Sequence, residues 1–227
     1  MLGMGKYRND KMELPVLFVI SPNALMDRRR STLEHLYSIG LHPKVFPGLY
    51  GDDIGLIPAH PIMTMGNSML TKGQTSLALN HWFLWQHIAL AEIPVAIIFE
   101  DDVVLPDHFR QQFDSLMSRV PDDWEWLYLS MTFPDRMMDG RIVVNEVCPD
   151  VWLHRECRTW DGAIDGSYAY MLKLSAARKI SGMKFLLDEP IDRWISFNVL
   201  PLVKTYIWHP SPIKQRSGVG GWKSSMS

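Results

Sequence analysis

Hydrophobic and polar residues along the first 130 positions follow two alternating patterns. Short apolar runs are typical of strands, and the stretches between them carry apolar residues at helical spacing. Strands that alternate with helices predict a parallel α/β sheet. After residue 130 the order becomes mixed. The expected strands lie at residues 15–20, 44–50, 94–99, 124–130, 141–147, 167–174 and 202–208. The pattern predicts an α/β protein in which a Rossmann-like half continues into a mixed half.

Several helices carry start and stop signals in the sequence. Asp27 is expected to cap the first helix and Gly40 to end it, because glycine tolerates the left-handed conformation that follows many helices. Thr71 and Gln74 fit a capping box at the start of a second helix. His81 lies on the apolar face of that second helix. Further helices are expected to begin near Pro106, Ser175 and Pro190.

Three adjacent acids, Glu100, Asp101 and Asp102, directly follow the apolar run at residues 95–99. Like charges repel one another, and burial raises the free-energy cost of each charged carboxylate. Ligands of open α/β sheets bind beyond the carboxyl ends of the strands, and carboxylate oxygens suit Mg²⁺ or Mn²⁺. The triplet therefore predicts a divalent metal site, with a solvated acidic turn as the alternative.

Composition narrows the classes of function. The 227 residues are 47% hydrophobic and carry a formal net charge of -2, so no basic field predicts binding to nucleic acid or to an anionic membrane. No apolar run reaches the roughly 20 residues of a membrane span, and the N-terminal stretch lacks the apolar core of a signal peptide. Cys148 and Cys157 form no CxxC motif. We expect reduced cysteines, no transmembrane segment and a cytoplasmic location.

Three stretches resemble glycosyltransferase family 25, which includes lipooligosaccharide and collagen galactosyltransferases. The stretches are VISPNALMDRRRSTLEHL, then LTKGQTSLALNHWFLWQHIALAEIPVAIIFEDDVVL, and then SYAYMLKLSAARKI followed by EPIDRW and HPSPIKQ. The second is the most specific, because it joins the histidine-to-tryptophan spacing of a helix to the Glu-Asp-Asp motif. The resemblance spans residues 15 to 215, nearly the whole chain.

The resemblance implies an A-type glycosyltransferase fold that binds a nucleotide-sugar donor with a divalent metal and inverts the anomeric centre. Asp102 would then be the principal metal ligand, and Asp101 would support the metal or its waters. Glu100 would face the nucleotide ribose or a supporting side chain. His209, at the end of the last expected strand, would complete the metal shell, and imidazole suits Mn²⁺ better than Mg²⁺.

The first turn departs from the family pattern, since residues 21–24 read Ser-Pro-Asn-Ala where the family usually has Asn-Leu-Asp-Arg. Arg28 or Arg29 could meet the donor diphosphate, and an exposed helix face is the alternative place for them. Gln74 replaces a family glutamate and serves equally well in a capping box. Asn80 replaces a family serine. His81 is either a core residue or, by its family match, lies under the donor site and orients an acid.

The general base of an inverting transfer must be a carboxylate away from the metal. The segment DEPIDRW offers Asp192 first, because it falls in the first turn of a helix and matches the acid of the family's Pro-Ile/Val-Asp motif. Glu189 is the second candidate and Asp165 the third. An acid that only stabilises the helix start is the alternative for Asp192.

The resemblance thus implies an inverting, metal-dependent transferase that moves a hexose, galactose first and glucose next, from a uridine diphosphate sugar. The acceptor would be a hydroxyl of a glycan or lipid-linked oligosaccharide such as lipooligosaccharide, with a peripheral position at a membrane left open. One alternative is a degenerate family member that binds nucleotide sugar, glycan or a partner without turnover. Another is a metal-dependent phosphoryl-transfer enzyme. Residues 1–14 are expected to be a flexible N-terminus, 15–210 a single glycosyltransferase domain, and 211–227 a tail or lid.

Overall fold

A large mixed sheet forms the centre of the protein in this computed structural model, which describes residues 14–56, 63–65, 70–132 and 134–216. Its eight strands follow the order β2-β1-β4-β9-β6-β11-β8-β7. Their bounds are β1 Val16–Pro22, β2 Lys44–Gly48, β4 Val95–Glu100, β6 Trp126–Tyr128, β7 Ile142–Cys148, β8 Val151–Cys157, β9 Ala169–Lys173 and β11 Thr205–Trp208. Strands β2, β1 and β4 run parallel, whereas β9 is antiparallel to both of its neighbours. The expected α/β class, with a parallel half that continues into a mixed half, is confirmed.

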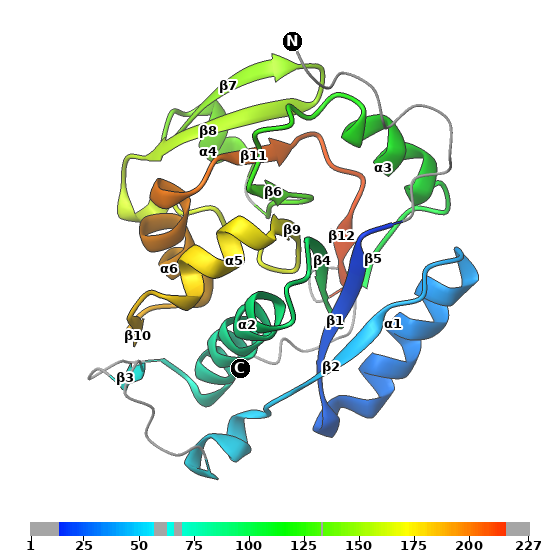
Figure 1. Cartoon of the computed structure of the whole chain (residues 1–227), viewed down its shortest axis with the longest axis vertical. Helices are drawn as coiled ribbons and strands as arrows, with labels where there is room; N and C mark the ends of the chain where they lie inside the picture. The colour runs from blue at the N-terminus through cyan, green and yellow to red at the C-terminus, as the bar shows by residue number, and fades with distance from the viewer. Residues whose placement is uncertain (1–13, 57–62, 66–69, 133, 217–227) are drawn as a thin grey trace.

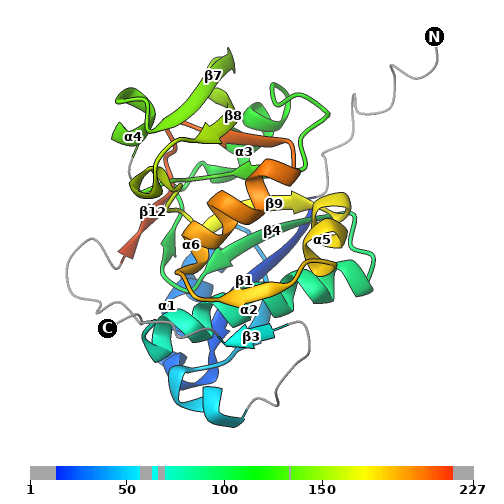
Figure 2. The same ribbon diagram turned by 90° about the vertical axis from the view of Figure 1, so that its left-hand side faces the viewer.

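Helices cover both faces of the sheet (Figure 1). They are α1 Met26–Ser38, α2 Lys72–Leu90, α3 Phe109–Met117, α4 Asp135–Met138, α5 Leu174–Ser181 and α6 Ile191–Trp194. Alternate residues of β4 point to opposite faces, as the two-residue period of a strand requires. Ile98 packs with α2 and α5 on one face, and Phe99 packs with α1 and α3 on the other. Figure 2 shows α2, α5 and α6 on the near face of the sheet.

Short elements complete the described chain. Two small pairs of strands lie outside the main sheet: β3 Met63–Met65 with β10 Phe185–Leu187, and β5 Val103–Val104 with β12 Lys214–Gln215. The last pair brings the C-terminal segment back to the residues that follow the acid triplet. Turns of 3-10 helix cover Asn23–Leu25, Gly51–Leu56, Trp160–Gly162 and Leu200–Leu202, and a π turn covers Ile195–Val199.

The structure tests the helix signals individually. Thr71 and Gln74 form the expected capping box of α2, and Gly40 has the positive φ of 78° expected after α1. Asp27 is not a cap: a 3-10 turn leads directly into α1, and Asp27 lies exposed in the first turn. Helix α3 begins only at Phe109, because a turn follows Pro106. Helix α5 begins at Leu174 without the Ser175 cap.

Two further expectations from the sequence concern the strands at one edge of the sheet and membrane-spanning helices. The hairpin of β7 and β8 is only half anticipated, since the sequence pattern gave a strand at 141–147 and missed Val151–Cys157. Within the described ranges, no helix combines the length and the apolar character needed to cross a membrane.

Candidate active site

The carboxyl ends of β1 and β4 bring the acid triplet next to the first turn of the chain. The two strands are parallel and in register, with Ile20 opposite Glu100. Ser21 therefore lies beside Asp101, and its hydroxyl donates a hydrogen bond of 2.9 Å to Asp101 Oδ2. Asp101 and Asp102 are only 3% and 2% exposed. The triplet is thus a buried site at the end of a strand and not a solvated acidic turn.

The positive charge beside the buried acids comes from Arg28 on α1. Its Nη2 atom lies 2.6 Å from Asp101 Oδ1 and 3.3 Å from Asp102 Oδ2, and its side chain is 11% exposed. Thr32, one turn further along α1, donates a 2.5 Å hydrogen bond to the Asp101 carbonyl oxygen. Burial raises the pKa of Asp101, although Arg28 and Ser21 both lower it. Helix α1 is therefore docked onto the acidic turn through the two Arg28 ion pairs and the Thr32 hydrogen bond.

The C-terminal segment closes the other side of the acidic turn. Gln215 donates through Nε2 to Asp102 Oδ2 at 3.1 Å, and the Arg216 amide donates to the Asp102 carbonyl oxygen at 2.8 Å. The Arg216 guanidinium also donates to the Ser31 hydroxyl on α1. The resemblance extended to Gln215, but sequence spacing alone gave no sign that this residue would touch the acids.

Arg29, the second residue expected to bind the donor diphosphate, makes hydrogen bonds that stabilise the turn after β1. Its Nη2 atom donates to the Ser21 carbonyl oxygen at 2.6 Å and to Asn23 Oδ1 at 2.9 Å, and its Nε donates to Ser21 Oγ at 3.3 Å. These bonds explain what the unusual Ser-Pro-Asn-Ala turn does in this chain. The turn offers a carbonyl, an amide and a hydroxyl oxygen that hold Arg29 beside Arg28.

A divalent metal does not fit the acid pair as the side chains stand. Asp101 Oδ1 and Asp102 Oδ2 already lie 2.6 and 3.3 Å from a guanidinium nitrogen, and a second cation at these two oxygens would be repelled. Among the described residues, no three or more His, Cys, Asp or Glu side chains gather in a way that could hold a metal ion. Metal dependence stays a prediction from the sequence.

His209 is not brought to the acid pair. It follows β11, which β9 and β6 separate from β4, so strand spacing alone puts it roughly 14 Å away. Its backbone amide donates to the Asp150 carbonyl oxygen at 3.0 Å, and its carbonyl accepts from Trp152 Nε1 at 3.1 Å. Burial lowers the pKa of His209, while Asp150 raises it. The sequence showed correctly that His209 ends a strand, but only the strand order decides which residues are its neighbours.

His81 lies beneath Glu100 at the end of a buried polar chain. Trp85 Nε1 donates to the Tyr170 hydroxyl at 2.8 Å, and this hydroxyl lies 2.8 Å from His81 Nδ1. Burial raises the pKa of Tyr170, so its hydroxyl keeps its proton and can donate it to Nδ1. The other ring nitrogen, Nε2, then carries hydrogen and lies 3.5 Å from Glu100 Oε1, slightly beyond a normal hydrogen bond.

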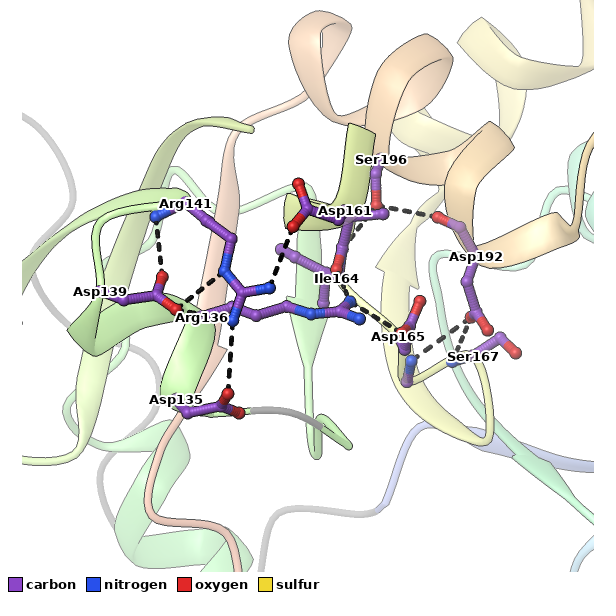
Figure 3. Close-up of polar contacts among 12 residues, drawn as sticks. Asp135, Arg136, Asp139, Arg141, Asp161, Ile164, Asp165, Ser167, Asp192 and Ser196 are labelled. Carbon is purple, nitrogen blue, oxygen red and sulfur yellow. Dashed lines mark hydrogen bonds and ion pairs between the residues drawn. The ribbon is translucent and has the colours of Figure 1, made fainter. Parts of the chain in front are cut away.

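Ser167 connects Glu100 to Asp192. Its hydroxyl donates to Glu100 Oε1 at 2.8 Å, and its backbone amide donates to Asp192 Oδ1 at 2.9 Å. The Gly166 amide also donates to Asp192 Oδ1, at 3.3 Å (Figure 3). A Cβ atom at Gly166 would lie 2.6 Å from the Ser130 carbonyl oxygen, so only glycine permits this tight turn. Sequence patterns did not predict this connection, although the small pair Gly166-Ser167 before a strand could have indicated a tight turn there.

Asp192 is the acid whose surroundings most oppose its charge. Burial raises its pKa to about 6, and the nearby charges of Asp165 and Glu100 act in the same direction. The amides of Ser167 and Gly166 lower the pKa but do not offset burial. A carboxylate with a pKa close to neutral can both lose and accept a proton at physiological pH, which suits a general base.

The two other candidate bases have different surroundings. Asp165 pairs with Arg136, which lies 2.7 Å from its Oδ2 and also donates to the Ala163 carbonyl oxygen at 2.5 Å (Figure 3). Glu189 accepts from Asn198 at 3.2 Å, and burial raises its pKa. The carboxylate of Asp165 is thus held by an arginine, and Glu189 lies outside the cavity that holds Asp192.

A cavity of about 290 Å³ joins the two ends of this network, close to the smallest of the roughly 300–1,000 Å³ sites that bind small molecules. Its lining residues are Gln74, Leu77, Glu100, Thr132, Asp165, Gly166, Ser167, Tyr168, Pro190, Asp192, Arg193 and Gln215. A larger cavity of about 520 Å³ lies near Arg119 and Asp150. We assign the site to the smaller cavity because it holds both Glu100 and Asp192.

A third, much smaller cavity shares Glu100 with the cavity of about 290 Å³. It has a volume of only about 20 Å³ and is lined by Arg28, Tyr50, Asn80 and Asp101, among others. The Asn80 side chain is held beside this cavity by two hydrogen bonds to Leu49. Its Oδ1 accepts from the Leu49 amide at 2.7 Å, and its Nδ2 donates to the Leu49 carbonyl oxygen at 3.0 Å. This explains why an amide can stand where the family has serine.

Comparison with known proteins places this geometry in a family. The model of the family described as "Glycosyltransferase family 25 (LPS biosynthesis protein)" matches residues 15–195. The chain is 26% identical over 218 residues to the probable inactive glycosyltransferase 25 family member 3 of Bos taurus, a match that covers 90% of this chain and 34% of that protein. It is 25% identical over 133 residues to procollagen galactosyltransferase 1-A of Xenopus laevis, covering 53% of this chain and 22% of that protein.

These relatives are much longer proteins, since the chain spans about a third of the length of the Bos taurus relative. Among solved structures, a glycosyltransferase involved in the glycosylation of the major capsid of PBCV-1 has a TM-score of 0.46 at 9% identity, over 85% of this chain and 81% of that one. The match over residues 15–195 extends from β1 to the turn after α6 and includes both the acid triplet and Asp192, and the chain belongs to glycosyltransferase family 25.

Proposed function

We propose that this chain transfers a hexose from a nucleotide sugar to a hydroxyl of a glycan acceptor, with inversion at the anomeric carbon and with Asp192 as the general base. One observation carries the proposal: Glu100 and Asp192 line the same cavity and are joined through Ser167. Glu100, proposed for the donor side, and Asp192, proposed for the acceptor side, are thereby held in fixed positions around one cavity of small-molecule size.

Asp192 has the placement and the proton affinity that the transfer requires. In a single displacement the acceptor oxygen bonds to the anomeric carbon, the bond to the diphosphate breaks, and the hydroxyl proton passes to a base. Two backbone amides hold Asp192 Oδ1, so Oδ2 is the oxygen proposed to take the proton. No step is assigned to a metal at Asp101 and Asp102, because Arg28 pairs with both of them.

The donor and the acceptor follow from the family. Relatives named procollagen galactosyltransferases favour a uridine diphosphate hexose, galactose first and glucose next. The family description as a lipopolysaccharide biosynthesis protein favours a lipid-linked oligosaccharide such as lipooligosaccharide as the acceptor. A cytoplasmic location, at most peripheral to a membrane, remains part of this proposal.

A second candidate function is binding without turnover. Relatives from Bos taurus and Mus musculus are named probable inactive or inactive glycosyltransferases. The pairing of Arg28 with the acids, which leaves a cavity of about 20 Å³ beside them, also favours this candidate. Thermal-shift measurements with a panel of uridine donors, together with assays for released nucleotide, separate the two. Binding without release of nucleotide in the presence or absence of acceptor would favour the binder.

Replacement of Asp192 tests the proposed base. We expect Asp192→Asn to bind the donor as wild type does and to lose at least about a hundredfold in turnover, because the amide cannot accept the proton. Glu189→Gln, which changes an acid outside the cavity, is the matched control and should stay within a few-fold of wild type. Calorimetry measures donor binding and a radiolabelled-sugar assay measures transfer. Near-normal turnover in Asp192→Asn would show that the base lies elsewhere.

A further inference from the structure

The buried acid pair already has a cation, and that cation belongs to the protein. Arg28 reaches Asp101 and Asp102 with one nitrogen, at 2.6 and 3.3 Å. The two carboxylates are 4% and 3% exposed at the side chain, so solvent screens this contact very little. Paired buried charges are far cheaper than unpaired ones, and Arg28 supplies the pairing that the triplet needs.

Two neighbouring side chains on α1 hold Arg28 at this position. Thr32 on the same helix, itself fully buried, binds the Asp101 carbonyl oxygen at 2.5 Å. Arg29, the next residue, is fixed to the Ser21 carbonyl oxygen at 2.6 Å. Helix α1 cannot shift away from the acids without breaking these bonds. The guanidinium is thus part of the local architecture and not a mobile surface side chain.

A divalent ion at Asp101 Oδ1 or Asp102 Oδ2 would compete with this guanidinium. Mg²⁺ and Ca²⁺ bind carboxylate oxygens at about 2.0 to 2.6 Å, and a guanidinium nitrogen already lies within 2.6 Å of Asp101 Oδ1. No third His, Cys, Asp or Glu ligand joins the pair among the residues that the structure places. His209, expected to be that ligand, lies beside Asp150 instead.

We infer that Arg28 is the resident cation of this acidic site and that it takes the place of a divalent metal beside the donor diphosphate. The second half of this inference rests on the proposed function. Arg28 lines the small cavity that also contains Tyr50 and Glu100, so it faces a space next to the proposed sugar site. A planar guanidinium pairs well with phosphate oxygens, and it needs no metal to do so. Arg29 adds positive charge at the same turn.

Direct Mn²⁺ binding tests the first half without any donor. Electron paramagnetic resonance of free Mn²⁺ should show no uptake by wild type at the acid pair, while Arg28→Gln should bind at least about tenfold more tightly, a difference of about 1.4 kcal/mol. Arg30→Gln, an exposed neighbour on the same helix, is the matched control and should behave as wild type. Uptake by wild type that Asp102→Asn abolishes would overturn the inference, as would failure of a folded Arg28→Gln to bind Mn²⁺.

The second half is tested on wild type, so it does not depend on the folding of a variant. Calorimetry should give the same uridine diphosphate affinity, within about twofold, in EDTA and in Mn²⁺. Affinity that is lost in EDTA would overturn the role of Arg28 at the diphosphate. If uridine diphosphate does not bind under either condition, the proposed function and this second half both fail, and the Mn²⁺ titration still decides the first half.

Discussion

At the scale of single residues, two buried aspartates of this site, Asp101 and Asp192, have different neighbouring groups. Asp101 is buried against an arginine and a hydroxyl, which lower its pKa, although burial raises that pKa by more. Asp192 is buried against two backbone amides and two other acids, so burial and repulsion raise its pKa to about 6. The chemistry of each acid is therefore set by its partners, and burial brings the pKa of Asp192 close to neutrality.

The pKa of Asp192 predicts how transfer depends on pH. The base must be ionised to accept a proton, so turnover should fall as the pH falls through about 6. A pH profile of kcat/KM measures this limb. Asp165→Asn should move the limb to lower pH, because removing a nearby negative charge makes ionisation of Asp192 easier. A limb that does not move would show that another group titrates.

The same shift predicts the opposite trend for stability. The folded state binds the Asp192 proton more tightly than the unfolded chain does, so the free energy of unfolding falls as the pH rises from about 4 to about 6. Asp192→Asn removes this cost and keeps an oxygen for the Ser167 amide. We expect the variant to be more stable than wild type near neutral pH, by up to about 3 kcal/mol.

Denaturant unfolding at two pH values measures this difference. The gain should disappear below about pH 4, where the wild-type carboxyl is protonated in both states. A helix acid that only favours the start of α6 would give the opposite result, since its replacement would lower stability. A less stable Asp192→Asn near neutral pH would therefore identify a structural acid.

At the scale of elements, helix α2 positions the buried polar chain. Its apolar face carries His81 and Trp85 into the core, where both reach the Tyr170 hydroxyl on β9. The capping box of Thr71 and Gln74 fixes where the helix begins. The start of the helix in turn decides which side chain lies under Glu100.

Loss of this cap predicts a measurable destabilisation. Thr71→Ala removes the side-chain oxygen that accepts from the Gln74 amide and should lower stability by about 1 kcal/mol. Asp27→Ala is the control, because Asp27 is exposed and caps nothing, and its cost should stay below about 0.5 kcal/mol. Thermal unfolding of both variants measures the difference. Equal costs would mean that the box contributes nothing beyond an ordinary surface residue.

At the scale of the whole molecule, the site is built from segments far apart in the chain. Helix α1, the turn after β4, the turn before β9, the start of α6 and strand β12 all contribute side chains (Figure 1). Ile213, just before β12, is 3% exposed and packs into the core on the α1 side of the sheet. The Ser130 hydroxyl donates to its carbonyl oxygen at 3.1 Å.

The packing of Ile213 predicts that the C-terminal segment stabilises the whole domain. Ile213→Ala should lower the free energy of unfolding by about 2–5 kcal/mol, because it opens a cavity in the core. The neighbouring Lys214→Ala, at an exposed position, should change stability by less than about 0.5 kcal/mol. Denaturant unfolding of the two variants provides the comparison. A small effect of Ile213→Ala would mean that this segment is not part of the cooperative core.

The sequence by itself determined the elements of the sheet and the local signals within them. Strand and helix periods depend on neighbouring residues, so the alternation up to β6, the Thr71 cap and the stop at Gly40 could all be predicted. The placement of the acid triplet at a strand end followed in the same way. Strand β8, which lies between β11 and the edge strand β7, was missed because its pattern, VWLHREC, mixes charged and apolar residues.

Only the tertiary structure decided which side chains meet. The sequence showed that Asp101 and Asp102 need a positive charge, but it could not choose between a metal ion and an arginine. Parallel pairing of β1 with β4 brings Arg28 to the acids, and the insertion of β9 and β6 keeps His209 away. The hydrogen bonds of Ser21 and Thr32 to Asp101 join residues 80 and 69 positions apart, and such distances depend on strand order and helix docking, which no local pattern encodes.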